Sequence, residues 1–147
     1  MTQIDFYIPH QTFNSSKFQL ACRLTEKAYQ AGKRVCISTE NESDAELIDK
    51  LLWTYSEQSF IPHDRCHESS TIEMDIITPV LIISQLAKTN EHEVLINLAD
   101  KTPTCFSQFD RLLEPLDNDK VTKDSGRERY RYYRDCGYQI NNHEIKH

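Results

Sequence analysis

The sequence predicts an α/β protein in which helices cover a mainly parallel β-sheet. Over the first 53 residues, short β-prone runs alternate with longer segments whose apolar residues have helical spacing. Further along, EVLINL (93–98) is nearly continuous in apolar character, which is typical of a strand buried on both faces. The length of 147 residues suits one compact domain spanning residues 1–147.

The first strand and helix are predicted from local signals. Residues 4–8 are β-prone and end at Pro9. A helix then runs from about residue 14 to residue 31, with Asn and Ser residues as N-caps and Gly32 as its stop. Its inward face comprises Phe18, Leu20, Ala21, Leu24 and Ala28.

A second strand and helix follow in the same order. Residues 34–38 predict the strand, and the helix begins near Ser43, with Glu46 as the partner in a capping box. The apolar positions of this helix, which ends before Trp53, are Ala45, Ile48, Leu51 and Leu52.

The rest of the chain carries shorter signals. Residues 59–63 predict an extended piece, and residues 79–86 and 93–98 predict strands. Residues 105–113 have helical spacing through Phe106, Phe109, Leu112 and Leu113. The polar run 117–123 predicts a loop, after which Ser125 opens a last helix that Gly137 closes.

The composition narrows the class of protein. The chain is 38% hydrophobic and 27% charged, as soluble globular proteins usually are. Because it contains no run of about 18 apolar residues, we expect no membrane span. Because no basic leader precedes an apolar stretch, we expect no secretory signal. The five cysteines include no CxxC pair, which favours reduced thiols in a cytoplasm.

The charge is distributed unevenly. Residues 120–134 carry a net charge of +4. Because the whole chain carries −6, the remaining residues carry −10. The basic residues of this window are Lys120, Lys123, Arg127, Arg129, Arg131 and Arg134. Such asymmetry favours a local site for an anion on a protein that repels polyanions elsewhere.

Several kinds of chemistry lack their sequence signals. The three glycines are too far apart for a G-x-G-x-x-G or Walker A loop, so the β-α rhythm does not predict nucleotide binding. HDRCH (63–67) has metal-like spacing but no second ligand pair, which favours a polar loop. With no nucleophile elbow either, we expect no cofactor, no metal and no catalytic site.

The stretch SGRERYRYYRDCGY (125–138) concentrates basic and aromatic side chains on one helix. Helical spacing places Lys123, Arg127, Tyr130, Arg131 and Arg134 on one face. Tyr132, Tyr133 and Cys136 turn toward another side, where we expect core packing. The basic face is either a solvated surface or a site for carboxylates beside an apolar group, such as an acidic peptide with an aromatic end. Single-stranded nucleic acid stacked on Tyr130 is the rival ligand.

These segments carry a family resemblance. The strings DFYIP, AGKRVCI, LLW…SFIPHD, VLINL, FSQFDRLLE and GRERYRYYRDCGY, followed by Asn142-His143-Glu144, span nearly the whole chain. In them the chain resembles the chi subunits of bacterial DNA polymerase III, which are clamp-loader accessory proteins. The resemblance implies a three-layer α/β/α Rossmann-like fold with no cofactor and no activity.

The resemblance also implies two partners. One is the acidic C-terminal tail of single-stranded DNA-binding protein (SSB), and the other is the psi subunit, which tethers chi to the clamp loader. The implied tail-binding residues are Arg127, Tyr130 and Arg131, with Lys123 nearby, Leu116 as an apolar wall and Arg134 extending the basic face. The family often has lysine in place of Arg131. Trp53 and Phe60 match the psi-facing patch, although either could instead belong to the core.

The sequence therefore leads us to expect a non-enzymatic, cytoplasmic replication adaptor. It would form a 1:1 complex with psi, bind the SSB tail and bind DNA only weakly. The alternative is a direct single-stranded nucleic-acid-binding protein that uses the same helix, and an enzyme is a distant third.

Overall fold

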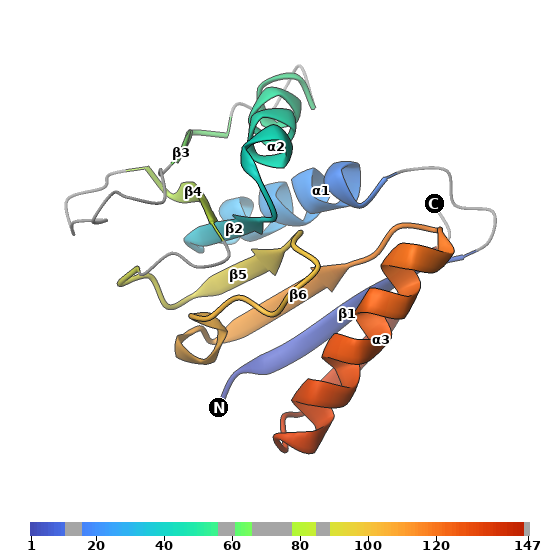
Figure 1. The fold of residues 1–147 in the computed structure, drawn as a ribbon. Helices are drawn as coiled ribbons and strands as arrows, with labels where there is room; N and C mark the ends of the chain where they lie inside the picture. Colours follow the sequence, from blue (N-terminus) through green and yellow to red (C-terminus); the bar gives the residue numbers. More distant parts are fainter. Residues whose placement is uncertain (11–15, 56–60, 66–77, 85–88, 146–147) are drawn as a thin grey trace.

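One sheet of parallel strands forms the centre of the molecule (Figure 1). The computed structural model describes residues 1–10, 16–55, 61–65, 78–84 and 89–145. Within them the sheet has seven strands in the order β3-β4-β2-β5-β6-β1-β7. The strands are β1 (Gln3–Pro9), β2 (Val35–Thr39), β3 (His63–Arg65), β4 (Val80–Ser84), β5 (Val94–Asn97), β6 (Arg111–Pro115) and β7 (Ile140–Ile145).

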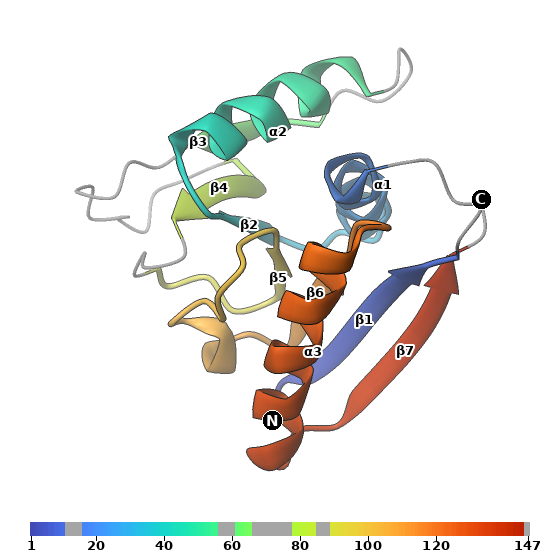
Figure 2. The same cartoon turned by 45° about the vertical axis from the view of Figure 1, so that its right-hand side comes forward.

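Helices cover both faces of this sheet, which confirms the α/β/α sandwich (Figures 1 and 2). The helices are α1 (Lys17–Gln30), α2 (Glu42–Thr54) and α3 (Lys120–Asp135). One apolar core, with Leu20, Ile37 and Ile48, lies between the sheet and α1 and α2. The other, with Leu95 and Tyr133, lies between the sheet and α3.

The first two helices confirm the sequence prediction, with one correction. Ser16 caps α1 and forms a capping box with Gln19, while Gly32 follows the helix at φ 79°. In α2 the cap is Asn41, whose side chain accepts from the backbone N–H of Asp44 at 2.8 Å. The expected capping box of Ser43 and Glu46 is therefore wrong, because Asn41 already satisfies the first turn.

The strands expected over 79–86 and 93–98 lie at β4 and β5, whereas the extended piece expected over 59–63 meets β3 only at His63. Residues 59–60 and 85–86 are outside the described residues, while His63 begins β3 and Val80–Ser84 form β4. β5 is buried at every position, as the EVLINL pattern predicted.

The expected helix over residues 105–113 is wrong. Only Phe106–Gln108 form a short 3-10 turn, η1, and β6 follows it. β6 lies between β5 and β1, so it is covered on both faces. Leu112 packs in the core beneath α3 and Leu113 in the opposite core. Apolar residues on both faces of a strand mimic part of a helical pattern here.

The last helix begins earlier than expected. Asp119 caps it, and α3 starts at Lys120 rather than Ser125, so the segment 117–123 is mostly helical. The carboxylate of Asp119 accepts from the backbone N–H of Thr122 at 2.8 Å, which lowers the pKa of Asp119. Gly137 follows the helix at φ 88°, as expected. The sequence pattern did not indicate β7, in which no residue is fully buried.

A buried polar network fixes α3 against the sheet. Arg129 donates its Nε to the carboxylate of Glu114 at 3.1 Å, and Tyr133 donates its hydroxyl at 2.7 Å. Asn97 donates its side-chain amide to the same carboxylate. Burial, followed by the nearby Glu114 charge, raises the pKa of Tyr133. One of the basic residues counted in the 120–134 window is therefore neutralised inside the molecule.

None of the helices in the described ranges has the length and apolar character that a membrane crossing requires.

Candidate functional site

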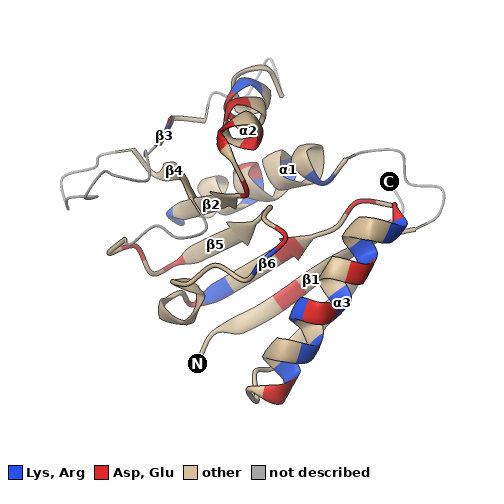
Figure 3. Cartoon of the chain, in the orientation of Figure 1, with Lys and Arg blue, Asp and Glu red and all other residues tan. Residues whose placement is uncertain are grey.

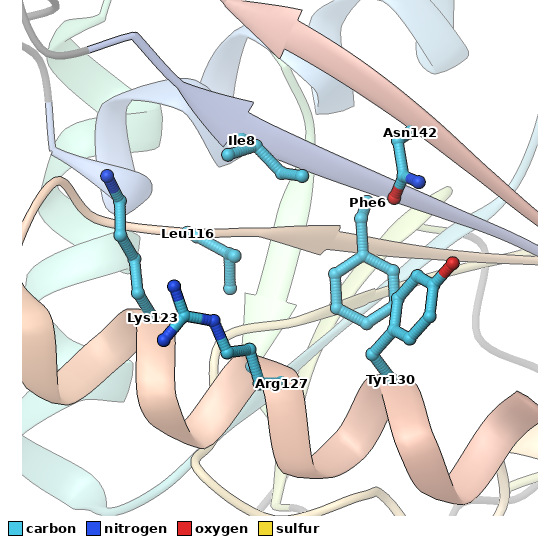
Figure 4. A pocket seen from close by; sticks show the side chains of 8 residues that line it. Phe6, Ile8, Leu116, Lys123, Arg127, Tyr130 and Asn142 are labelled. Atoms are coloured by element: carbon cyan, nitrogen blue, oxygen red, sulfur yellow. The ribbon is translucent and has the colours of Figure 1, made fainter.

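A cavity of about 370 Å³ opens between α3 and the neighbouring strands (Figure 4). Four of its lining residues come from α3 and the others from β1, β7 and the segment after β6. These residues are Phe6, Ile8, Leu116, Lys123, Gly126, Arg127, Tyr130 and Asn142. The parallel pairing of β6, β1 and β7 brings these distant segments together under the helix.

The floor and one wall of the cavity are apolar. The rings of Phe6 and Tyr130 lie 5.4 Å apart between centroids at an angle of 58°. Leu116 is 5% exposed and packs directly against Gly126 in the middle of α3. An apolar group of a ligand would therefore exchange water for contact with aromatic and aliphatic carbon.

Two cationic side chains stand at the rim of this apolar floor, as Figure 4 shows. Lys123 donates its Nζ to the side-chain oxygen of Asn118 at 2.9 Å, and Asn118 donates in turn to the carbonyl of His10. The Arg127 side chain is 69% exposed and contacts Asp124 at 3.1 Å, one turn earlier in α3. A surface pair of this kind is weak, so Arg127 can turn to a carboxylate of a ligand.

The structure brings together four of the expected tail-binding residues. Leu116, Lys123, Arg127 and Tyr130 all line the cavity. In the described part of the chain, Arg131 and Arg134 are not among the lining residues, although both are exposed on α3. Figure 3 shows acidic residues interspersed among the basic residues of this helix.

The expected core packing is correct for only one of three residues at the end of α3. Tyr133 is fully buried, but Tyr132 is 49% exposed and Cys136 is exposed. The reason is geometric, since α3 contacts the sheet along one narrow face and Tyr132 lies beside that face.

Four lining residues were missed by sequence reasoning about the site. Ile4, Phe6 and Ile8 occupy every second position of β1. This period of two could have assigned Phe6 and Ile8 to the same face of the sheet. Gly126 is a glycine inside a helix, which is itself a signal of close approach. Asn142 belongs to the Asn142-His143-Glu144 string of the family resemblance, but β7 was not predicted, so nothing in the sequence placed it beside α3.

The second expected surface lies on the other side of the sheet. Trp53 occupies the last turn of α2 and is 51% exposed, so it is not a core residue. Its ring lies 4.4 Å from the ring of His63, between centroids. Phe60, the other residue expected there, lies outside the described residues.

The metal-like run at 63–67 is described only in part. His63 contacts Asp49, and the hydroxyl of Thr78 donates to Asp64. Over the ranges that the structure describes, no group of three or more His, Cys, Asp or Glu side chains could hold a metal ion.

Comparisons with known proteins agree with one another. A family model described as "DNA polymerase III chi subunit, HolC" matches residues 1–141. The chain is 31% identical over 145 residues to the DNA polymerase III subunit chi of Pseudomonas aeruginosa, a match that covers 99% of this chain and 98% of that protein. It is 30% identical over 142 residues to the protein of the same name in Haemophilus influenzae, covering 95% of each. The corresponding Escherichia coli protein is 28% identical over 125 residues, covering 84% of this chain and 82% of that protein.

Proposed function

The chain belongs to the family of DNA polymerase III chi subunits, which are replication accessory proteins, and from this membership we propose that it is a non-enzymatic adaptor. In this proposal the cavity beside α3 binds the acidic C-terminal tail of SSB. The Trp53 surface binds psi in a 1:1 complex, which links SSB-coated template to the clamp loader in the cytoplasm.

The combination of an apolar floor and a cationic rim supports the assignment of the tail. Phe6, Leu116 and Tyr130 suit a terminal aromatic side chain, and the volume of about 370 Å³ is at the small end of ligand pockets. Lys123 and Arg127 suit the terminal carboxylate and the acidic residues that precede it. A ligand with both features in adjacent positions gains from both parts of the site.

Single-stranded nucleic acid fits the same site less well. Tyr130 already packs against Phe6, with ring centroids 5.4 Å apart at an angle of 58°, so part of its ring surface is in contact with another ring before a base could stack on it. One short helix neutralises only a few phosphates. The rest of a polynucleotide would cross a surface with a charge balance of −10, which repels it.

Fluorescence anisotropy with a labelled acidic peptide that ends in phenylalanine, and with a labelled oligonucleotide, tests the proposal. We expect the peptide to bind far more tightly than the oligonucleotide at physiological salt. Replacing Arg127 with Ala should weaken peptide binding by about thirtyfold, or about 2 kcal/mol, because a charge-assisted contact is lost. Removing the terminal phenylalanine should cost more than removing one acidic residue.

Arg134→Ala is the matched control. Arg134 is also an exposed arginine of α3, with a side chain 62% exposed, but it lies outside the cavity lining. We expect its replacement to change peptide affinity by about twofold or less, through long-range charge alone. Equal losses in the two variants, or equal binding of peptide and oligonucleotide, would contradict the proposed site.

A further inference from the structure

His63 is a buried histidine whose two ring nitrogens both face oxygen atoms. Its side chain is 1% exposed. The Nε2 atom lies 2.6 Å from Oδ1 of Asp49 in α2, and the Nδ1 atom lies 2.9 Å from the carbonyl oxygen of Ile61. Ile61 is itself 1% exposed, so water does not readily replace the ring as the partner of that carbonyl.

These two contacts determine how many protons the pair carries. A carbonyl oxygen and an ionised carboxylate only accept hydrogen bonds, whereas a neutral imidazole has a single N–H to donate. A neutral ring beside an ionised carboxylate would leave one of the two contacts without a proton. Both contacts are hydrogen bonds only when the His63–Asp49 pair carries one additional proton. An imidazolium satisfies both contacts, because each of its two N–H groups then faces an acceptor oxygen.

The same ring lies against Trp53. The two ring centroids are 4.4 Å apart at an interplanar angle of 50°. A cation at this distance from an indole is attracted by the negative face of its π-system. Trp53 is 51% exposed in the last turn of α2, so contact with the buried His63 ring helps to fix the rotamer of a side chain that is half exposed to solvent.

Among the residues that the structure describes, the charges around the ring are compatible with an imidazolium. From α2 the ring faces Asp49, and from β3 the guanidinium of Arg65 reaches within 3.9 Å of the other oxygen of Asp49. Arg65 is neutralised by Glu42 of α2 at 2.7 Å. The neighbouring strand β4 places the apolar Val80 opposite His63.

We propose that His63, held as an imidazolium between Asp49 and the carbonyl of Ile61, is the positioning residue that presents the Trp53 indole to a protein partner. The proposal rests on the proposed function only for the identity of that partner. The protonated ring and its effect on Trp53 are properties of the free protein.

NMR of the histidine side-chain nitrogens, at neutral pH and with 15N labelling, tests the first half. We expect His63 to show two ring N–H groups, with its signals assigned by their loss in His63→Gln. In Asp49→Asn, which keeps the shape of the side chain but removes its charge, we expect the second proton to be lost. A neutral His63 in the wild-type chain would overturn the proposal.

Tryptophan fluorescence tests the second half, because Trp53 is the only tryptophan in the chain. An imidazolium in contact with an indole quenches its emission. We therefore expect stronger emission from His63→Gln and Asp49→Asn than from the wild type at neutral pH. If His63→Gln does not fold, Asp49→Asn provides the same readout. Unchanged emission in the folded variants would overturn the contact with Trp53.

His143→Gln is the matched control. His143 also contacts a carboxylate, with its Nε2 3.0 Å from Oδ1 of Asp5, but its ring stacks on Tyr7 instead of Trp53. We expect this variant to leave Trp53 emission and psi binding unchanged. An equal rise of emission in His143→Gln would contradict the proposal.

Binding to purified psi completes the test. We expect about a tenfold loss of affinity in His63→Gln and Asp49→Asn, since Trp53 remains present but is less well positioned. Unaltered affinity in both variants would remove the positioning role. Failure of the wild-type chain to bind psi would contradict the proposed function, while the NMR and fluorescence results on the free protein would stand.

Discussion

Gly126 allows Leu116 to form the floor of the cavity. A Cβ atom at this position would lie 2.9 Å from Cδ2 of Leu116 and 3.1 Å from Cδ1. These separations are shorter than the optimal contact between carbon atoms, which is about 3.5–4.0 Å. Glycine in a helix interior costs about 1 kcal/mol relative to alanine, so the close approach explains its presence in α3.

Replacing Gly126 with Ala should therefore reduce tail binding without removing any charged group. The new methyl group displaces Leu116 toward the cavity and makes it shallower. We expect about a tenfold loss of affinity for an acidic peptide that ends in phenylalanine. Fluorescence anisotropy measures the loss, and thermal unfolding shows whether the fold is retained.

The double variant Gly126→Ala with Leu116→Val tests the cause. Valine is shorter than leucine by one methylene, so it no longer meets the added methyl group. We expect Gly126→Ala to cost less peptide affinity when it is added to Leu116→Val than when it is added to the wild-type chain. Simple addition of the two single effects would show that the contact is not responsible.

At the scale of elements, the network around Glu114 fixes the position of α3. Glu114 is fully buried, and the Arg129 side chain that neutralises it is 7% exposed.

Arg129→Met leaves the carboxylate buried without its charge partner, which we expect to lower the free energy of unfolding by about 3 kcal/mol or more. Urea unfolding measures this loss. Arg131→Met is the control on the same helix, since Arg131 is exposed, and we expect a change within about 0.5 kcal/mol. Similar values for both variants would contradict this account.

Asp5 joins the three strands β1, β6 and β7. Its side chain is 2% exposed, and it accepts from Arg111 at 2.8 Å, from His143 at 3.0 Å and from Asn141 at 3.4 Å. Burial alone would raise the pKa of Asp5. The hydrogen bonds from His143 and Arg111, with the charge of Arg111, outweigh burial and hold this pKa below its usual value.

Acid should therefore destabilise the protein partly through Asp5. Because the pKa of Asp5 is lower in the folded state, its contribution is fully present above the unfolded value of about 4 and is lost as the pH falls through the folded value. We expect Asp5→Asn to reduce stability near neutral pH and to flatten the decline below about pH 4. Urea unfolding as a function of pH measures both effects. Asp135→Asn, at a side chain 72% exposed, should keep the wild-type pH dependence. An unchanged acid profile in Asp5→Asn would exclude this carboxylate as a source of the decline.

For the whole molecule, the two proposed surfaces lie on helices at opposite faces of the sheet, α3 and α2 (Figure 1). Because the two proposed surfaces do not share a helix, we expect both proposed partners to bind at the same time. Replacing Trp53 with Ala should weaken psi binding by about 2 kcal/mol, as at an interface hot spot, and leave tail binding unchanged. Pull-down with psi and anisotropy with the tail peptide measure the two affinities. Unfolding of the variant would instead make Trp53 a structural residue, and a parallel loss of tail binding would show that the surfaces are coupled.

Local patterns in the sequence were sufficient for much of the fold. The spacing of Leu20, Ala21 and Leu24 predicted α1, and EVLINL predicted a strand buried on both faces. The basic aromatic helix and three of the residues that line the cavity, Lys123, Arg127 and Tyr130, were also recognisable, because the charge pattern and the helical period extend over only a few turns. These features depend on residues that are close together in the chain.

Only the tertiary structure decided which segments meet. Leu112 and Leu113 look helical by spacing, and only the position of β6 between β5 and β1 makes that segment a strand. Phe6 and Asn142 reach one cavity because β1 pairs with β7, across more than a hundred residues of sequence. The tertiary structure also decides which charge is available to a ligand, since Arg129 is buried and neutralised by Glu114 while Arg127 remains exposed. The physical reason is that periodicity is a local property, whereas strand pairing, burial and charge compensation are set by contacts between distant parts of the chain.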